Sequence, residues 1–182
     1  MKRFAEVAFV DIKPDMTEWV GKIVEWENDR SIRHLIRPSN SESEFESSTI
    51  IASEIEQRLD NYAKSQKRFF WGLLADNQPA GTLAAEIDCP QLYNPEPGTI
   101  WPGLVIGEAG LRRRGVGRQA MVWLEKVARE QNCRRIELGV FEYNEPARAL
   151  YSSLGYREFA YMPEFTWWRR QLWTDIRMEK WL

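Results

Sequence analysis

The chain has 182 residues, of which 43% are hydrophobic and 29% are charged, and its formal net charge at pH 7 is −2. This length favours one domain with a full core, and the balance of apolar and charged residues is typical of a globular protein. The small net charge provides no overall basic field for nucleic acid, and no apolar run reaches the roughly 18 residues of a membrane-spanning helix.

Few side chains are available for metal or redox chemistry. Cys89 and Cys133 are the only cysteines and are not spaced as a metal-binding or redox pair, and His34 is the only histidine. We therefore expect no metal site. The N-terminus leads into a strand-like run without the apolar segment of a signal peptide, so a reducing cytoplasm is the expected location.

The first half of the chain predicts a strand, two helices and a hairpin. Loose alternation over residues 6–13 indicates a strand, and apolar residues near helical spacing over 19–26 indicate a helix. Residues 38–48 are polar and acidic without periodicity, which predicts a mobile loop. A second helix is expected over 49–65, followed by two hairpin arms within 68–87.

The second half predicts a strand–helix–strand unit, a further helix and two closing strands. These elements are expected at residues 100–107, 114–131, 135–141, 144–154, 157–165 and 175–182, and Gly155 ends the last helix. The resulting order, β-α-α-β-β-β-α-β-α-β-β, predicts one α/β or α+β sheet domain. We find no internal repeat and no second domain.

The sharpest motif joins a strand to a helix through a loop that contains Gly115 and Gly117. Glycine removes side chains that would block a ligand, and free N–H groups at a helix N-terminus attract anions. A P-loop would need Gly-Lys-Ser or Gly-Lys-Thr, and a dinucleotide-binding loop would need an acidic residue at the end of the following strand, about 20 residues later. The chain has neither, and a tight turn beside solvated arginines remains an alternative.

A second motif begins at Asn144, a good helix N-cap, with Pro146 in the first turn. Ala147, Leu150 and Tyr151 share one face of this helix. Considered alone, Tyr151 is a core aromatic residue.

Together, the two motifs resemble those of the GNAT superfamily of acetyl-CoA-dependent N-acetyltransferases. The first matches as Arg112-x-x-Gly115-x-Gly117, and the second as Asn144-x-x-Ala147-x-x-Leu150-Tyr151-x-x-x-Gly155-Tyr156, with Tyr156 where phenylalanine is usual. The resemblance covers residues 99–182 clearly, and it implies one domain with a mixed, mostly antiparallel sheet, a splayed parallel strand pair and flanking helices. Segments Trp26-Glu27-Asn28-Asp29 and 173–179 are similar to the branch of ribosomal-protein, spermidine and some antibiotic acetylases.

The resemblance also implies roles for individual residues. Backbone N–H groups of the arginine-rich loop would hold the CoA pyrophosphate, the preceding strand and the later helix cap would bind pantetheine, and Tyr151 would protonate the departing thiolate. A phenol suits this role because its pKa is comparable to that of a thiol. The residues expected to bind acetyl-CoA are Val105, Ile106, Arg112, Arg113, Arg114, Gly115, Val116, Gly117, Arg118, Asn144 and Ala147.

A base is needed because only a neutral amine attacks. Glu86, Glu108, Glu137 and Glu142 lie on or near the expected site strands, and each could instead be a solvated or paired carboxylate. We favour Glu108 slightly, because it follows the strand that would carry the acetyl group.

We therefore expect direct acetyl transfer from acetyl-CoA, without a metal, to a small-molecule or peptide amine. Residues 1–66 would form the acceptor side of the single domain and residues 99–156 its acetyl-CoA-binding core. Two alternatives stay open: a CoA-binding module without efficient turnover, and a nucleic-acid-binding protein that uses the arginine cluster, against which the net charge counts. We expect neither nucleic acid nor membrane as a partner, and a homodimer is left open.

The acidic segment suggests the charge of the acceptor. Glu42, Glu44 and Glu46 would lie in the part of the chain that usually forms one wall of the acceptor groove in the family. A negative wall would favour a cationic acceptor, whereas a solvated acidic face is the simpler interpretation.

Overall fold

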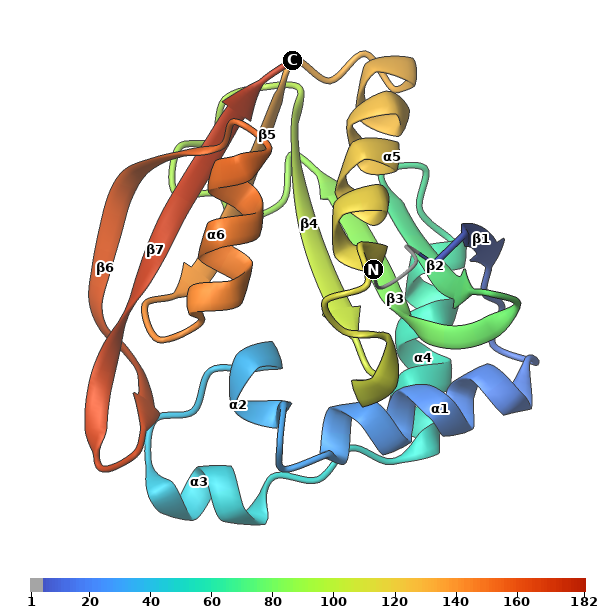
Figure 1. Cartoon of the computed structure of the whole chain (residues 1–182), viewed down its shortest axis with the longest axis horizontal. Coiled ribbons are helices and arrows are strands. Elements are labelled where there is room, and N and C mark those ends of the chain that lie inside the picture. The colour runs from blue at the N-terminus through green and yellow to red at the C-terminus, as the bar shows by residue number, and fades with distance from the viewer. Residues whose placement is uncertain (1–4) are drawn as a thin grey trace.

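The computed structural model describes residues 5–182, which form a single α/β domain around one seven-stranded sheet (Figure 1). The strands are Val7–Asp11 (β1), Arg68–Ala75 (β2), Gln78–Ile87 (β3), Thr99–Ile106 (β4), Arg135–Phe141 (β5), Arg157–Trp168 (β6) and Gln171–Trp181 (β7). The helices are Thr17–Asn28 (α1), Arg33–Ile36 (α2), Glu42–Ser47 (α3), Ala52–Ala63 (α4), Val116–Glu130 (α5) and Glu145–Ser153 (α6), with a short 3₁₀ helix at Ala109–Leu111.

The sheet is divided into two halves that meet along a very short parallel contact. Its strand order is β1-β2-β3-β4-β5-β7-β6, and every neighbouring pair is antiparallel except β4 and β5. These two strands are paired only at Thr99 with Arg135 and at Ile100 with Ile136. Beyond that point the halves diverge toward α1 and α2, at the bottom of the view in Figure 1.

Helices cover both faces of the sheet, because alternate side chains of a strand point to opposite sides. On one face, α5 and α6 pack on the strands; α5 contributes Ala120 and Leu124, and β5 contributes Ile136 and Leu138.

On the other face, α1 and α4 cover the first half of the sheet. Trp19 and Ile23 of α1 and Ile55 and Leu59 of α4 pack there with Phe70 of β2. Within the described residues, no helix is both long enough and apolar enough to cross a membrane.

The predicted fold class is confirmed, but the loop expected at residues 38–48 is wrong. This segment contains α3, whose N-cap Ser41 accepts a hydrogen bond from the Glu44 amide at 3.2 Å. Phe45 of α3 is buried, so this short helix is fixed by packing as well as by its cap.

The closing strands are longer than the sequence indicates. They continue to a tight turn at Arg169 and Arg170, where both φ angles are positive, at 50° and 66°. Such a turn normally carries glycine or asparagine, so two arginines give no signal for it.

Candidate active site

The N-terminus of α5 presents a run of unpaired backbone N–H groups. The chain enters this helix through Arg113 and Gly115, whose φ angles of 59° and 83° are left-handed. The first helical hydrogen bond runs from the Gln119 amide to the Gly115 carbonyl, at 3.1 Å. Within the described part of the chain, the N–H groups of residues 113–118 make no hydrogen bond. These donors and the helix dipole form a site suited to phosphate.

The arginine side chains of this loop fix its conformation. Arg112 donates from Nε to the Ile106 carbonyl at 3.0 Å and from a terminal nitrogen to the Gly107 carbonyl at 2.6 Å. It therefore satisfies carbonyl groups at the end of β4.

The next arginines bind other elements. Arg114 forms an ion pair with Asp76 at 3.0 Å, and Arg118 donates to the Ser153 hydroxyl at 3.1 Å. Arg113 is exposed. The arginines thus contact different elements, so the sequence cluster does not form a basic patch of free side chains.

The edge of β4 that faces β5 is open over its second half. Pro102, which has no N–H to donate, comes two residues after the last position paired with β5. Gly103 is exposed although it lies inside a strand, and Val105 and Ile106 are half-buried. An extended ligand with amide groups can pair with such an edge, because backbone polar groups need partners.

Tyr151 lies on α6 and is 9% exposed. Its ring centroid is 5.9 Å from that of Tyr156, and burial raises the pKa of its hydroxyl to about 12. Tyr151 is therefore protonated at neutral pH, the state that a proton donor requires.

Asn144 is the N-cap of α6, and its Oδ1 accepts a hydrogen bond from the Ala147 amide at 3.3 Å. The predicted capping role is confirmed. Ala147 packs against the core beneath α6. The sequence-predicted contacts of these residues with acetyl-CoA stay predictions.

Glu108 lies at the end of β4 beside an open cavity of about 380 Å³. Its Oε1 accepts hydrogen bonds from Lys22 Nζ and Trp26 Nε1, both at 3.2 Å. Bonds to Glu25 and Glu108 raise the pKa of Lys22. The cavity is lined by Glu25, Trp26, Asn28, Asp29, Gly107, Glu108 and Ala109, and so has three carboxylates.

The other predicted base candidates are engaged elsewhere or lie away from this cavity. Glu86 pairs with Arg68 at 2.9 Å, and Glu137, which is 0% exposed, pairs with Arg135 at 2.6 Å. The backbone of Glu142 pairs with Thr174. Glu108 is the member of the predicted set that the structure places at the cavity.

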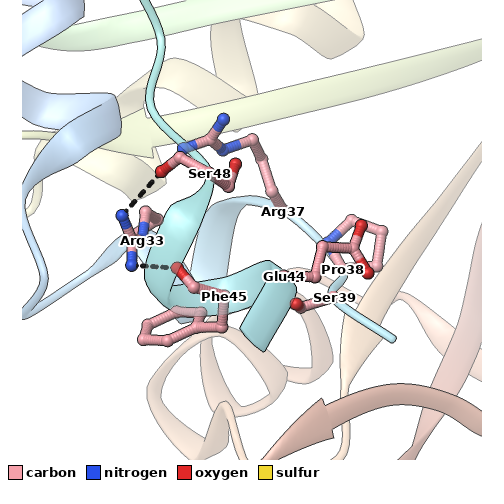
Figure 2. Close-up of a pocket in the computed structure, with 7 residues that line it drawn as sticks. All are labelled: Arg33, Arg37, Pro38, Ser39, Glu44, Phe45 and Ser48. Atoms are coloured by element: carbon pink, nitrogen blue, oxygen red, sulfur yellow. Dashed lines mark hydrogen bonds between the residues drawn. The ribbon is translucent and has the colours of Figure 1, made fainter. Parts of the chain in front are cut away.

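The segment from α2 to α3 is held together by a buried arginine (Figure 2). Arg33 is 6% exposed and donates hydrogen bonds to the carbonyls of Phe45 and Ser48, close to the C-terminus of α3. Burial lowers the pKa of Arg33. Because hydrogen bonds from a charged donor are strong, Arg33 holds α2 against the C-terminal end of α3.

The acidic residues of α3 are only partly free. The Glu44 carboxylate accepts a hydrogen bond from the Asn40 amide at 2.8 Å, and Glu46 pairs with Arg30. Glu42 is exposed.

An aromatic cluster that the sequence did not reveal joins this segment to the β6–β7 hairpin. The rings of His34 and Trp168 are stacked with centroids 4.0 Å apart, and Phe45 packs edge-on against Trp168 at 5.1 Å. The Tyr143 hydroxyl donates to the His34 carbonyl at 2.6 Å. Aromatic residues spread widely along a chain give no sign of such a cluster, because tertiary contacts alone bring them together.

Asp175 of β7 is a second residue that sequence reasoning missed. It is 4% exposed and forms an ion pair with Arg177 at 2.8 Å. Burial raises the pKa of this carboxyl to about 6, although Arg177 opposes the shift. In the sequence, the only sign of this residue is an acidic side chain at the start of a predicted closing strand, and such a sign is weak. The structure pairs it with Phe141 of β5.

Comparison with known proteins agrees with this geometry. A model of the Acetyltransferase (GNAT) family matches residues 29–156, so the chain belongs to the GNAT acetyltransferase family. An uncharacterized N-acetyltransferase from Lactobacillus delbrueckii subsp. lactis is 29% identical over 105 residues, which are 58% of this chain and 61% of that protein. The chain thus matches about three fifths of the length of this relative.

Solved structures share the whole fold at low sequence identity. A putative acetyltransferase, yncA, from Salmonella typhimurium with its cofactor acetyl-CoA has a TM-score of 0.77 at 14% identity, covering 97% of this chain and 94% of that one. A spermidine N-acetyltransferase from Vibrio cholerae in complex with CoA and spermine has a TM-score of 0.76 at 14% identity, covering 96% and 95%. These likenesses show the fold.

Proposed function

We propose that this protein transfers an acetyl group from acetyl-CoA directly to an amine. The observation that carries the proposal is that two features lie close together: the unpaired N–H groups at the N-terminus of α5 and the open edge of β4. The Cβ position of residue 117 in α5 lies within 4 Å of Leu104 of β4 and Leu150 of α6, and the Glu108 cavity follows the end of β4. A pyrophosphate suits the first and a pantetheine arm suits the second. In this proposal, residues 99–156 hold acetyl-CoA, and residues 1–66 form the acceptor side.

The chain supplies the acid for the leaving group. As the thioester C–S bond breaks, the sulfur takes a proton from the Tyr151 hydroxyl, which burial keeps protonated. Asn144 would contact the pantetheine arm through its amide nitrogen, because its Oδ1 already caps α6. Glu108 remains a predicted base, and its carboxylate also suits the binding of a cationic acceptor.

The acceptor in this proposal is a small-molecule or peptide amine. Reducing cytoplasm is the proposed location, because Cys89 and Cys133 are both buried and free.

The test combines binding with turnover. Calorimetry of the purified protein with CoA should show binding, and thiol release from acetyl-CoA should depend on an added amine from a panel of polyamines, aminoglycosides and peptide N-termini. Binding without thiol release for any amine would leave a CoA-binding module. Absence of CoA binding together with salt-dependent binding of DNA or RNA would favour the nucleic-acid alternative.

A further inference from the structure

Strands β4 and β5 separate after Ile100 and Ile136, and we call the space between them the split. A carboxylate lies beside β5 just beyond the point of separation. The side chain of Asp175, from β7, lies over Gly139, in the part of β5 whose backbone no longer pairs with β4. A Cβ built on residue 139 would be 2.7 Å from Asp175 Oδ2, 2.9 Å from Oδ1 and 3.1 Å from Trp101 Cη2. Glycine at position 139 therefore makes room for this carboxylate between the two diverging strands.

The residues that cover Asp175 are themselves only partly covered. Gly139 and Trp101 are each only half-buried, whereas their neighbours Leu138 and Val140 on β5 are buried. Asp175 itself is nearly covered, so few water molecules can solvate its charge. A carboxylate in such a place is a stronger base than one in water.

The counter-ion of Asp175 is shared. Arg177, whose Nε is 2.8 Å from Oδ2, also lies 4.0 Å from Glu137 and donates to the Gln91 carbonyl at 2.9 Å. Its guanidinium also covers the Trp101 ring at 4.7 Å. The charged group next to Asp175 is thus Arg177 of β7, which Glu137 of β5 also approaches. The titratable neighbour is Tyr143, after β5; burial raises its pKa, and Asp175 adds a smaller increase.

We propose that Asp175 is the residue that takes the proton from the acceptor amine. This inference rests on the proposed function. Glu108, the alternative base, lies just after β4, on the opposite side of the split from β5. Its Oε1 already accepts hydrogen bonds from Lys22 and Trp26, so this carboxylate is better suited to holding the acceptor than to taking its proton.

The proton balance of the step is complete. An N–H bond of the ammonium group breaks and an O–H bond forms on Asp175, leaving a lone pair on the amine. That pair forms the C–N bond, the C–S bond breaks, and the sulfur takes the Tyr151 proton. The second proton of the nitrogen returns to Tyr151 through solvent, and Asp175 releases its proton to solvent. One proton is released for each acetyl group transferred.

Two variants distinguish the two carboxylates. Asp175→Asn keeps the size of the side chain and cannot accept the proton, so kcat at saturating amine should fall about 10²- to 10⁴-fold. The wild-type decline of kcat below a pKa near 6 should disappear from the variant. Glu108→Gln should raise the KM of the amine and keep that decline. A kcat and a pH profile unchanged by Asp175→Asn would overturn the inference, as would loss of the decline in Glu108→Gln alone.

A second measurement uses the wild type, in case Asp175→Asn does not fold. An acceptor whose conjugate acid has a pKa below about 5, such as an aromatic amine, is already neutral and needs no base. Its kcat should be level between pH 5 and 7, whereas kcat for an aliphatic amine should decline. The same decline with both acceptors would contradict the role of Asp175. Failure of the wild type to acetylate any amine would instead contradict the proposed function, so the two failures are distinguishable.

Discussion

Gly117 and Leu150 face each other across the contact between α5 and α6. A Cβ built on residue 117 would lie 3.1 Å from Leu150 Cδ2 and 3.6 Å from Leu104 Cδ2. The absence of a side chain therefore allows α6 to approach the first turn of α5. Substitution at this position affects packing as well as the proposed pyrophosphate site, so a test of the site needs a variant of equal size.

Gly117→Glu and Gly117→Gln provide this comparison. Both should lower the free energy of unfolding by about 1–3 kcal/mol, because either side chain displaces Leu150. The negative charge of Glu at the helix N-terminus should weaken CoA binding a further threefold to tenfold, or roughly 0.7–1.4 kcal/mol. Calorimetry would measure the difference. Equal CoA affinity for wild type and both folded variants would remove the pyrophosphate assignment.

Tyr151→Phe should lower the rate of acetyl transfer about 10²- to 10⁴-fold, because it removes the acid and keeps the ring. The matched control is Tyr156→Phe, whose ring is 5.9 Å away and which has no assigned part in the chemistry. Single-turnover thiol release with saturating amine would measure both. If Tyr151→Phe matches Tyr156→Phe in rate, another group protonates the thiolate.

Glu25→Gln should raise the KM of a cationic amine about twofold to fivefold at low salt, because Glu25 lines the cavity beside Glu108. Glu42→Gln is the control, since Glu42 is exposed on α3 and makes no ion pair within residues 5–182. We use Glu42 alone, because changing Glu44 and Glu46 as well would break the contact of Glu44 with Asn40 and that of Glu46 with Arg30. Steady-state kinetics at two salt concentrations would test the idea, and equal effects of the two single changes would contradict it.

Asp175 should make folding pH-dependent. Its pKa is about 6 in the folded protein, against the ordinary aspartate value of 3.8 expected for the unfolded chain, so the folded protein binds the proton first. Its contribution to stability is complete below pH 3.8 and is lost as pH rises through about 6. Relative to Asp175→Asn, the wild type should gain about 2 kcal/mol between pH 7 and pH 4. Urea unfolding at several pH values would measure this, and a constant difference would contradict it.

The sequence predicts the core of the fold because local patterns determine it. The apolar faces of α5 and α6 and the alternation in β5 follow from residues close together in the chain. The same applies to the loop before α5, where Gly115 adopts the left-handed conformation that the pattern requires. The N-cap role of Asn144 follows in the same way.

The parts that sequence reasoning missed depend on contacts between distant segments. Helix α3 needs Trp168 for the packing of Phe45, so its own polar residues indicate only a loop. Asp175 gains its properties from Gly139, Trp101 and Arg177, which lie on three different stretches of chain. Neither composition nor spacing contains this information, because burial and partner distances exist only after the sheet has formed.

The contact between Ser39 and the end of β6 has a consequence for protein synthesis. The Ser39 amide donates to the Thr166 hydroxyl at 3.0 Å, across 127 positions of sequence. A nascent chain releases Ser39 from the ribosome long before Thr166, and closing so long a loop is entropically costly. The segment from α2 to α3 therefore gains its contacts with the β6–β7 hairpin only when translation has passed that hairpin, so an interrupted chain would emerge without them.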